Sequence, residues 1–126
     1  MSLIDQIGEL LTIPVNDNGG CFYYLFYNCS KLIKAPILPA TSLALNCYYG
    51  MFQSCTSLTE APALPATNLA RGCYFGIFWG CASLTEAPVL PATNLTANCC
   101  SHMFSNCTSL TEAPVLPATS LDTFCY

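Results

Sequence analysis

The apolar positions of this chain recur in registers that lie 26 residues apart. Several registers hold one residue type throughout, namely Cys21, Cys47, Cys73, Cys99 and Cys125; Cys29, Cys55, Cys81 and Cys107; Phe26, Phe52, Phe78 and Phe104; and the leucine sets that begin at Leu32, Leu38 and Leu43. A fixed period of this length is typical of a repeat protein, in which stacked units bury one continuous core. The pattern therefore predicts a solenoid of about 26 residues per coil.

The first segment of each unit has apolar residues at a spacing of four. In the unit that starts at Cys47, the apolar residues Cys47, Met51 and Cys55 stand at i, i+4 and i+8, with Phe52 beside them. This spacing places them on one face of an amphipathic helix. The pattern predicts a short helix of about two turns here.

The next segment of each unit, read in the sequence "LTEAPALP", is expected to be extended. Pro62 and Pro65 exclude a helix, and each removes one backbone donor from a sheet. A strand of about two to four residues is expected around Thr59–Ala61. Elsewhere in the unit asparagine, serine and glycine replace one another, which predicts a positive φ at two registers: Asn46, Gly72 and Asn98; and Asn28, Ser54, Gly80 and Asn106.

The repeats resemble those of one known family. The sequences "MFQSCTSL", "IFWGCASL" and "MFSNCTSL" are similar to the Phe-x-x-Cys-x-x-Leu pattern of BspA-type leucine-rich repeats, which occur on bacterial surface proteins and in some protist proteins. The resemblance covers roughly residues 21–126, although each unit is longer than the shorter family repeat and carries a second proline. It implies short parallel strands on one side of a leucine-rich-repeat solenoid, short helices or 3-10 turns on the other, and no enzymatic activity.

The two ends of the chain differ from the middle. Residues 1–20 are expected to form an N-terminal cap helix followed by a degenerate repeat, because Leu3, Ile4, Ile7, Leu10 and Leu11 suit an amphipathic helix. Residues 21–126 are expected to form about four units, with a C-terminal end that is truncated or uncapped. No signal peptide is visible in this sequence.

Composition excludes several classes of partner. The chain is 53% hydrophobic and 8% charged, and its three basic residues cannot form the basic stripe of a nucleic-acid binder. No apolar run approaches the ~20 residues of a membrane span. Glu60, Glu86 and Glu112 form a column headed by Lys34, which we interpret as a solvated edge, with a contact for a cation or a basic partner as the alternative.

Ten cysteines raise the questions of metal binding, disulfides and catalysis. Their spacing of eight and then eighteen residues does not match a zinc site, so no metal and no cofactor is expected. Buried thiols are favoured over disulfides between coils, which the stacking would also permit. Cys100 breaks the pattern and is expected to be the most exposed thiol. His102 lies near it in one unit only, without an oriented third group, so no enzyme is predicted.

The aromatic residues that vary between copies are the candidate binding site. Tyr23, Tyr27, Tyr49, Phe75 and Trp79 occupy two registers four residues apart, and both registers become serine one unit later, at Ser101 and Ser105. Such variation indicates that the core does not dictate these residues, so an outward face is expected, with stacking of Tyr23 on Tyr27 and of Phe75 on Trp79. Exposed aromatics can anchor a partner, although packing against a neighbouring module explains them equally well.

Two functions remain in competition. The first is a non-catalytic recognition module that binds a protein or a glycan, on a bacterial cell surface or secreted according to the family resemblance. The second is a structural spacer that carries another domain. Self-association through uncapped ends or exposed aromatics is a further expectation for either.

Overall fold

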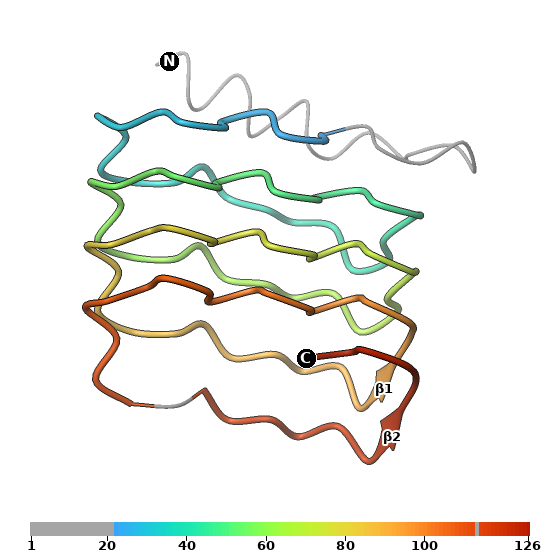
Figure 1. The fold of residues 1–126 in the computed structure, drawn as a ribbon. Helices are drawn as coiled ribbons and strands as arrows, with labels where there is room; N and C mark the ends of the chain where they lie inside the picture. The colour runs from blue at the N-terminus through green and yellow to red at the C-terminus, as the bar shows by residue number, and fades with distance from the viewer. Residues whose placement is uncertain (1–21, 113) are drawn as a thin grey trace.

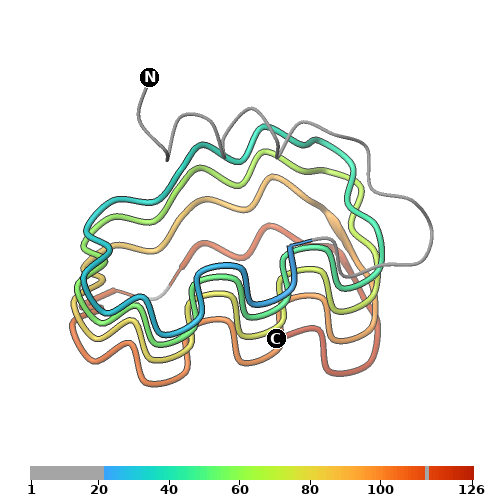
Figure 2. The ribbon, with the colours of Figure 1, turned by 90° about the horizontal axis from the view of Figure 1, so that it is seen from above.

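The chain winds through coils that lie one above another. The computed structural model describes residues 22–112 and 114–126. Figures 1 and 2 show the described coils following one path from level to level. Backbone hydrogen bonds join neighbouring levels; for example, the N–H of Tyr48 donates to the carbonyl of Cys73 at 3.0 Å. The predicted cap helix and degenerate repeat at 1–20, and Cys21, lie outside the described residues.

Each coil has two long sides with different backbones. We call the side that bends repeatedly the turn wall; it comprises residues 22–28, 46–54, 72–80 and 98–106. We call the opposite side the extended wall; it comprises residues 33–40, 59–66, 85–92 and 114–118. Seen from above in Figure 2, the turn wall follows a square-edged zigzag that repeats at every level, whereas the extended wall is smoother. The core fills the space between the two walls.

The turn wall pairs its backbone groups in two alternating directions. The N–H groups of Gly50 and Phe52 donate to the next coil, at 2.8 and 3.0 Å. The N–H groups of Met51 and Gln53 donate within their own coil to carbonyls three residues earlier, at 3.2 and 3.0 Å. This alternation satisfies the backbone without a helix or a continuous strand, which is what a buried wall needs.

A residue in the left-handed region bends the turn wall every four positions. Positive φ was predicted at the two registers where asparagine, serine and glycine exchange, and it is confirmed there, for example at Asn46 (53°) and Ser54 (62°). A third register was missed: Tyr24, Gly50, Gly76 and His102. An α-helix cannot contain such residues at every fourth position.

The predicted short helix of the turn wall is therefore wrong in its backbone. No helix occurs among the residues that the structure describes, and thus none there is long and apolar enough to cross a membrane. The predicted apolar stripe is nevertheless buried, since Cys47, Met51 and Cys55 are almost fully inaccessible. A bend every four residues and a helix of 3.6 residues per turn bring the same side chains inward over so short a segment.

The phenylalanine register forms the spine of the core. Successive rings of Phe26, Phe52, Phe78 and Phe104 stack with centroids 5.5, 5.9 and 5.9 Å apart and nearly parallel planes. The contact of each phenylalanine with the next, which the repeat predicted, is confirmed. Leu58 and Leu64 reach the same core from the extended wall.

One cysteine register is held by hydrogen bonds between coils. The thiols of Cys55, Cys81 and Cys107 each donate to a phenylalanine carbonyl one coil earlier, at 3.1 Å. All described cysteines except Cys29 are buried. The expectation that Cys100 is the most exposed thiol is wrong, because its side chain is 2% exposed and lies over the core beside Cys99.

The extended wall has little sheet structure. Strands β1 (Asn94–Leu95) and β2 (Ser120–Leu121) pair in parallel, Asn94 with Ser120 and Leu95 with Leu121, at one end of this wall. At the other end, isolated parallel bridges join Lys34, Glu60 and Glu86. The strand expected around Thr59–Ala61 is thus reduced to the single bridge position Glu60. The prolines between these two ends remove donors that a longer ladder would require.

Candidate functional site

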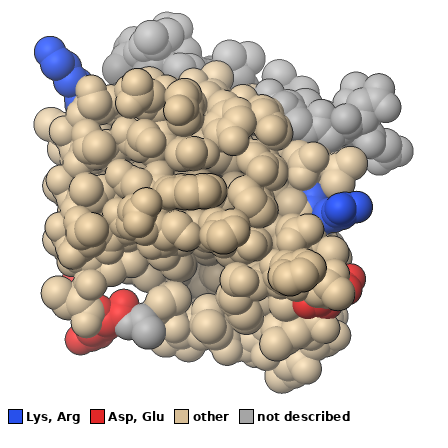
Figure 3. Space-filling model, in the orientation of Figure 1, with Lys and Arg blue, Asp and Glu red and all other residues tan. Residues whose placement is uncertain are grey.

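The turn wall carries a row of aromatic rings on its outer side. We call this row the aromatic strip; it comprises Tyr23, Tyr24, Tyr27, Tyr49, Phe75, Trp79 and His102. All five sequence-predicted site residues belong to it, and the structure brings them together across three successive coils. Figure 3, in the orientation of Figure 1, shows charged side chains only toward the margins of this face. The strip is therefore a largely uncharged surface.

Three rings of the strip form a column from coil to coil. Tyr23 stacks on Tyr49 with centroids 4.8 Å apart, and Tyr49 stacks on Phe75 at 4.5 Å, with interplanar angles of 15° and 10°. The bends of the turn wall cause this, because they repeat in register and place one side chain above the next. The inner faces of these rings are consequently occupied by neighbouring rings, and the column presents ring edges along the strip.

Two residues with positive φ link this column to the register of Tyr27 and Trp79. Tyr24 makes edge contacts with Tyr23, Tyr27 and Tyr49, at 4.5, 5.3 and 5.6 Å between centroids. Its ring lies over Gly50, where an added Cβ would collide with it. Glycine at this position suits the positive φ and leaves the space that Tyr24 occupies.

His102 is the second of these residues and makes similar contacts further along the turn wall. Its ring contacts Phe75 at 5.4 Å and Trp79 at 5.3 Å, and its Nδ1 lies 3.3 Å from the hydroxyl of Ser105. The predicted direct stacking of Phe75 on Trp79 is wrong, because His102 bridges these two rings. Tyr24 likewise bridges Tyr23 and Tyr27, which share no direct ring contact among the described residues.

The rings of the strip differ in exposure. Tyr23 and Tyr27 are 47% and 53% exposed, whereas Tyr49, Phe75 and Trp79 are half-buried. Burial, followed by the neighbouring tyrosines, raises the pKa of Tyr24.

Sequence reasoning missed Tyr24 and His102. Both occupy the register of Gly50 and Gly76, to which sequence reasoning assigned no role. The signal was the recurrence of glycine four residues from the asparagine register, because glycine at that spacing indicates a further positive φ. A positive φ inferred at these two glycines would have predicted that a large ring in this register lies over the same position of the next coil.

A shallow cavity of about 280 Å³ adjoins the strip. It lies where the chain enters the turn wall, and its lining comprises Leu45, Asn46, Tyr49, Arg71, Gly72, Phe75 and Asn98. Two rings of the column thus form one side of it, and Arg71 and two amides contribute polar groups. No sequence pattern had indicated this cavity.

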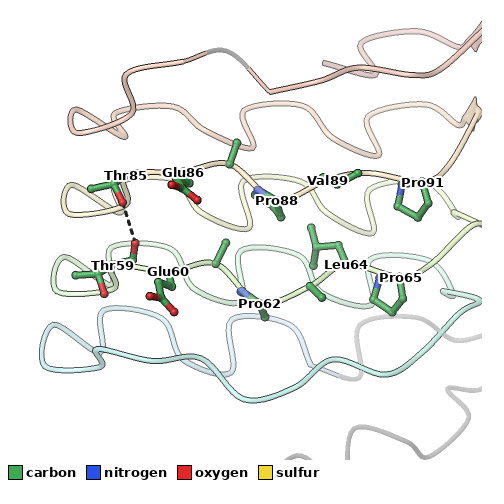
Figure 4. A pocket seen from close by; sticks show the side chains of 13 residues that line it. Thr59, Glu60, Pro62, Leu64, Pro65, Thr85, Glu86, Pro88, Val89 and Pro91 are labelled. Atoms are coloured by element: carbon green, nitrogen blue, oxygen red, sulfur yellow. Dashed lines mark hydrogen bonds between the residues drawn. The ribbon is translucent and has the colours of Figure 1, made fainter.

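A larger groove of about 640 Å³ lies on the extended wall between two coils. Figure 4 shows Glu60 and Glu86 near one end, with Pro62 and Pro88 further along. At that same end the hydroxyl of Thr85 donates to the carbonyl of Thr59 at 3.5 Å, and this bond is drawn in the figure. The groove follows from the prolines, since the coils are not tied together along this stretch.

The extended wall also carries an exposed aliphatic register that sequence reasoning missed. Ile37, Val89 and Val115 are at least 70% exposed, and Ala63 shares their register. The available signal was variation between copies, the same signal that identified the aromatic residues. It passed unnoticed because these residues are small and lie between prolines.

The cysteine and histidine side chains do not converge into a chemical site. The ring of His102 belongs to the aromatic strip, while Cys99 and Cys100 lie inside, with their sulfur atoms 3.7 Å apart. The neighbouring Cys99 thiol, and then burial, raise the pKa of Cys100. Among the residues described, no three His, Cys, Asp or Glu side chains are grouped as a metal site.

No protein-family model, curated protein or solved structure matches the chain.

Proposed function

We propose that the chain is a leucine-rich-repeat solenoid of the BspA type that recognises a partner through the aromatic strip, without catalysis. The observation that carries this proposal is the strip itself. Its rings are held in register over several coils, Tyr23 and Tyr27 are about half exposed, and the surface around them is poor in charge. Large aromatic side chains that are fixed by their neighbours bind a partner at a low cost in side-chain entropy.

The geometry favours a protein partner over a glycan. A sugar ring binds an aromatic residue by lying on an open ring face. In the column of Tyr23, Tyr49 and Phe75 the inner faces cover one another. Ring edges and half-buried apolar surface suit the side chains of another protein. A location on a bacterial surface, which the family resemblance implies, belongs to this proposal.

The test replaces the two most exposed tyrosines of the aromatic strip. Tyr23→Ser combined with Tyr27→Ser removes them, and serine already occupies both registers at Ser101 and Ser105. Phe124→Ser is the matched control, because Phe124 is an exposed ring outside the strip. The wild-type chain and both variants are assayed against a panel of purified extracellular proteins and a glycan array, with sedimentation to detect self-association and a thermal melt to check folding.

We expect binding to a protein of the panel that weakens by ~1–4 kcal/mol in the double variant and is unchanged in Phe124→Ser. Binding to glycans alone would overturn the choice of a protein partner. Binding that survives the double variant, with an unchanged melt, would show that the strip does not recognise the partner. The spacer function would take its place if the wild-type chain bound nothing and did not self-associate.

A further inference from the structure

One register of three successive coils lines the cavity beside the strip. Asn46, Gly72 and Asn98 occupy one register, each at positive φ. The side chain of Asn46 extends over Gly72, and an added Cβ on Gly72 would collide with its Oδ1 atom. The space that a side chain at Gly72 would need is therefore taken by the Asn46 side chain, and Asn46, Gly72 and Asn98 together line the cavity.

The polar groups around the cavity are unused within the described residues of the chain. The guanidinium of Arg71 and the side-chain amides of Asn46 and Asn98 form no hydrogen bond or ion pair with a described residue. Asp122, whose register adjoins that of Arg71, accepts the N–H of Thr123 at 2.7 Å. A fork of guanidinium donors and two amide groups are thus available to a ligand.

The electrostatic character of the cavity favours an anion. Among the described residues that line the cavity, Arg71 is the only one with a charged side chain. Tyr49 and Phe75 stack face to face, so they present ring edges, which carry the positive region of the aromatic quadrupole. A planar guanidinium matches a carboxylate through two parallel hydrogen bonds. All of these features favour a carboxylate over a neutral or cationic group.

We propose that this cavity receives the carboxylate of an aspartate or glutamate side chain from an acidic segment of the protein partner. The proposal rests on the proposed function, since it names the chemistry that the partner presents beside the aromatic strip. Its volume, about 280 Å³, suits one side chain. The partner's carboxylate pairs with Arg71, and the amides of Asn46 and Asn98 supply further donors. The apolar portion of the same partner segment contacts the edges of Tyr49 and Phe75.

The test uses a small probe that needs no knowledge of the partner. N-acetylglutamate N-methylamide is titrated into the isotope-labelled chain, and the NMR signals of the Arg71 Nε–H and of the asparagine side-chain amides are followed. N-acetylglutamine N-methylamide, which has the same shape without the charge, is the matched ligand. We expect saturable shifts with the glutamate probe that weaken as salt is added, and none with the glutamine probe.

Variants assign the binding to Arg71. Arg71→Gln should lower the affinity for the glutamate probe at least ~10-fold, and Arg71→Lys should lower it less, because lysine keeps the charge and loses the fork. Lys34→Gln removes a cation on the extended wall and should change nothing. Equal shifts with both probes, no saturable shift, or undiminished binding in Arg71→Gln would each overturn the proposal.

The pocket and the function of the strip can fail separately. If the partner found on the protein panel is lost by Tyr23→Ser with Tyr27→Ser but binds Arg71→Gln normally, the strip retains its function and the pocket proposal falls. If the panel yields no partner at all, the proposed function falls, and the titration alone decides whether the cavity binds a carboxylate.

Discussion

The two walls of each coil solve the problem of stacking in different ways. The turn wall ties every level to the next through alternate N–H groups, as at Tyr48, Gly50 and Phe52. Among the described residues, the extended wall is tied from coil to coil near its ends, by the bridges at Glu60, by the bridge of Ser42 with Asn68 and by the short pairing of β1 with β2. The same 26-residue repeat therefore produces one closely hydrogen-bonded side and one side held mainly by the burial of its leucines.

This difference also separates the surfaces of the molecule. Where the backbone is paired in register, side chains stack above one another, and the result is a row of rings with a small cavity beside it. Where prolines interrupt the pairing, a groove of about 640 Å³ remains between coils, flanked by exposed aliphatic residues such as Val89. The bonding of each wall thus determines the kind of surface that it presents.

The largest expected difference in stability is between a proline placed in the turn wall and a proline placed in the extended wall. Gln53→Pro removes the N–H that donates to Gly50 at 3.0 Å and puts a ring into a tight bend, so it should destabilise the fold by ~3 kcal/mol or more. Ala63→Pro removes an N–H that makes no hydrogen bond among the described residues, in a segment already extended between Pro62 and Pro65. It should be neutral, or stabilising by up to ~1 kcal/mol.

Chemical unfolding of both variants measures this contrast. Gln53→Ala is the control that separates the loss of the side chain from the loss of the backbone bond. Similar losses of stability in the two proline variants would show that the extended wall is bonded as tightly as the turn wall, and the comparison of the walls would fail.

A smaller effect is expected where the thiol register reinforces the turn wall. Cys81→Ala removes the hydrogen bond from the thiol to the carbonyl of Phe52 and leaves a small void, so it should cost ~1–2 kcal/mol of unfolding free energy. Cys29→Ala, at the exposed member of this register, should change stability by less than ~0.5 kcal/mol. An equal loss of stability at both positions would show that the thiol hydrogen bond and the burial of Cys81 do not cause the effect.

The same thiols should make stability depend on alkaline pH. Burial raises the pKa of Cys81 to about 12, from an ordinary value of 9.0. The folded state therefore keeps its proton while the unfolded state loses one, so this contribution is complete below about pH 9 and declines as pH rises toward 12. Unfolding midpoints across this range should fall less steeply in Cys81→Ala than in the wild-type chain.

The repeat registers gave a reliable prediction of which residues meet, and a less reliable one of backbone shape. The contacts along Phe26, Phe52, Phe78 and Phe104 followed from the 26-residue period alone. The predicted helix was wrong, because the apolar positions of a segment as short as Cys47–Cys55 fit a bend every four residues as well as a helix of 3.6 residues per turn. Only Gly50, read together with the asparagine register, carried the information.

The candidate site shows the same division. Variation between copies indicated Tyr23, Tyr27, Tyr49, Phe75 and Trp79, and the structure places all five on one strip. The bridging rings and the cavity beside Gly72 depend on how side chains of one coil extend over glycines of the next, as Tyr24 extends over Gly50 and Asn46 over Gly72. No pattern within a single unit contains that information, because it arises between one coil and the next.

The smallest expected change in stability comes from two side chains of the turn wall. The backbone of this wall is well paired, but two of its buried side-chain hydroxyls have no hydrogen-bond partner among the described residues. The hydroxyls of Tyr48 and Tyr74 have none within the described residues of the chain, although both rings are almost fully buried. Phe22 occupies the same register one coil earlier. Because an unsatisfied buried hydroxyl destabilises the folded state, Tyr74→Phe should raise the free energy of unfolding by up to ~1 kcal/mol, whereas Tyr27→Phe, at an exposed ring, should leave it unchanged. Thermal and chemical melts of the two variants measure the difference, and a clear loss of stability in Tyr74→Phe would reveal that the hydroxyl is bonded in solution and that the interior of the turn wall is as fully paired as its backbone.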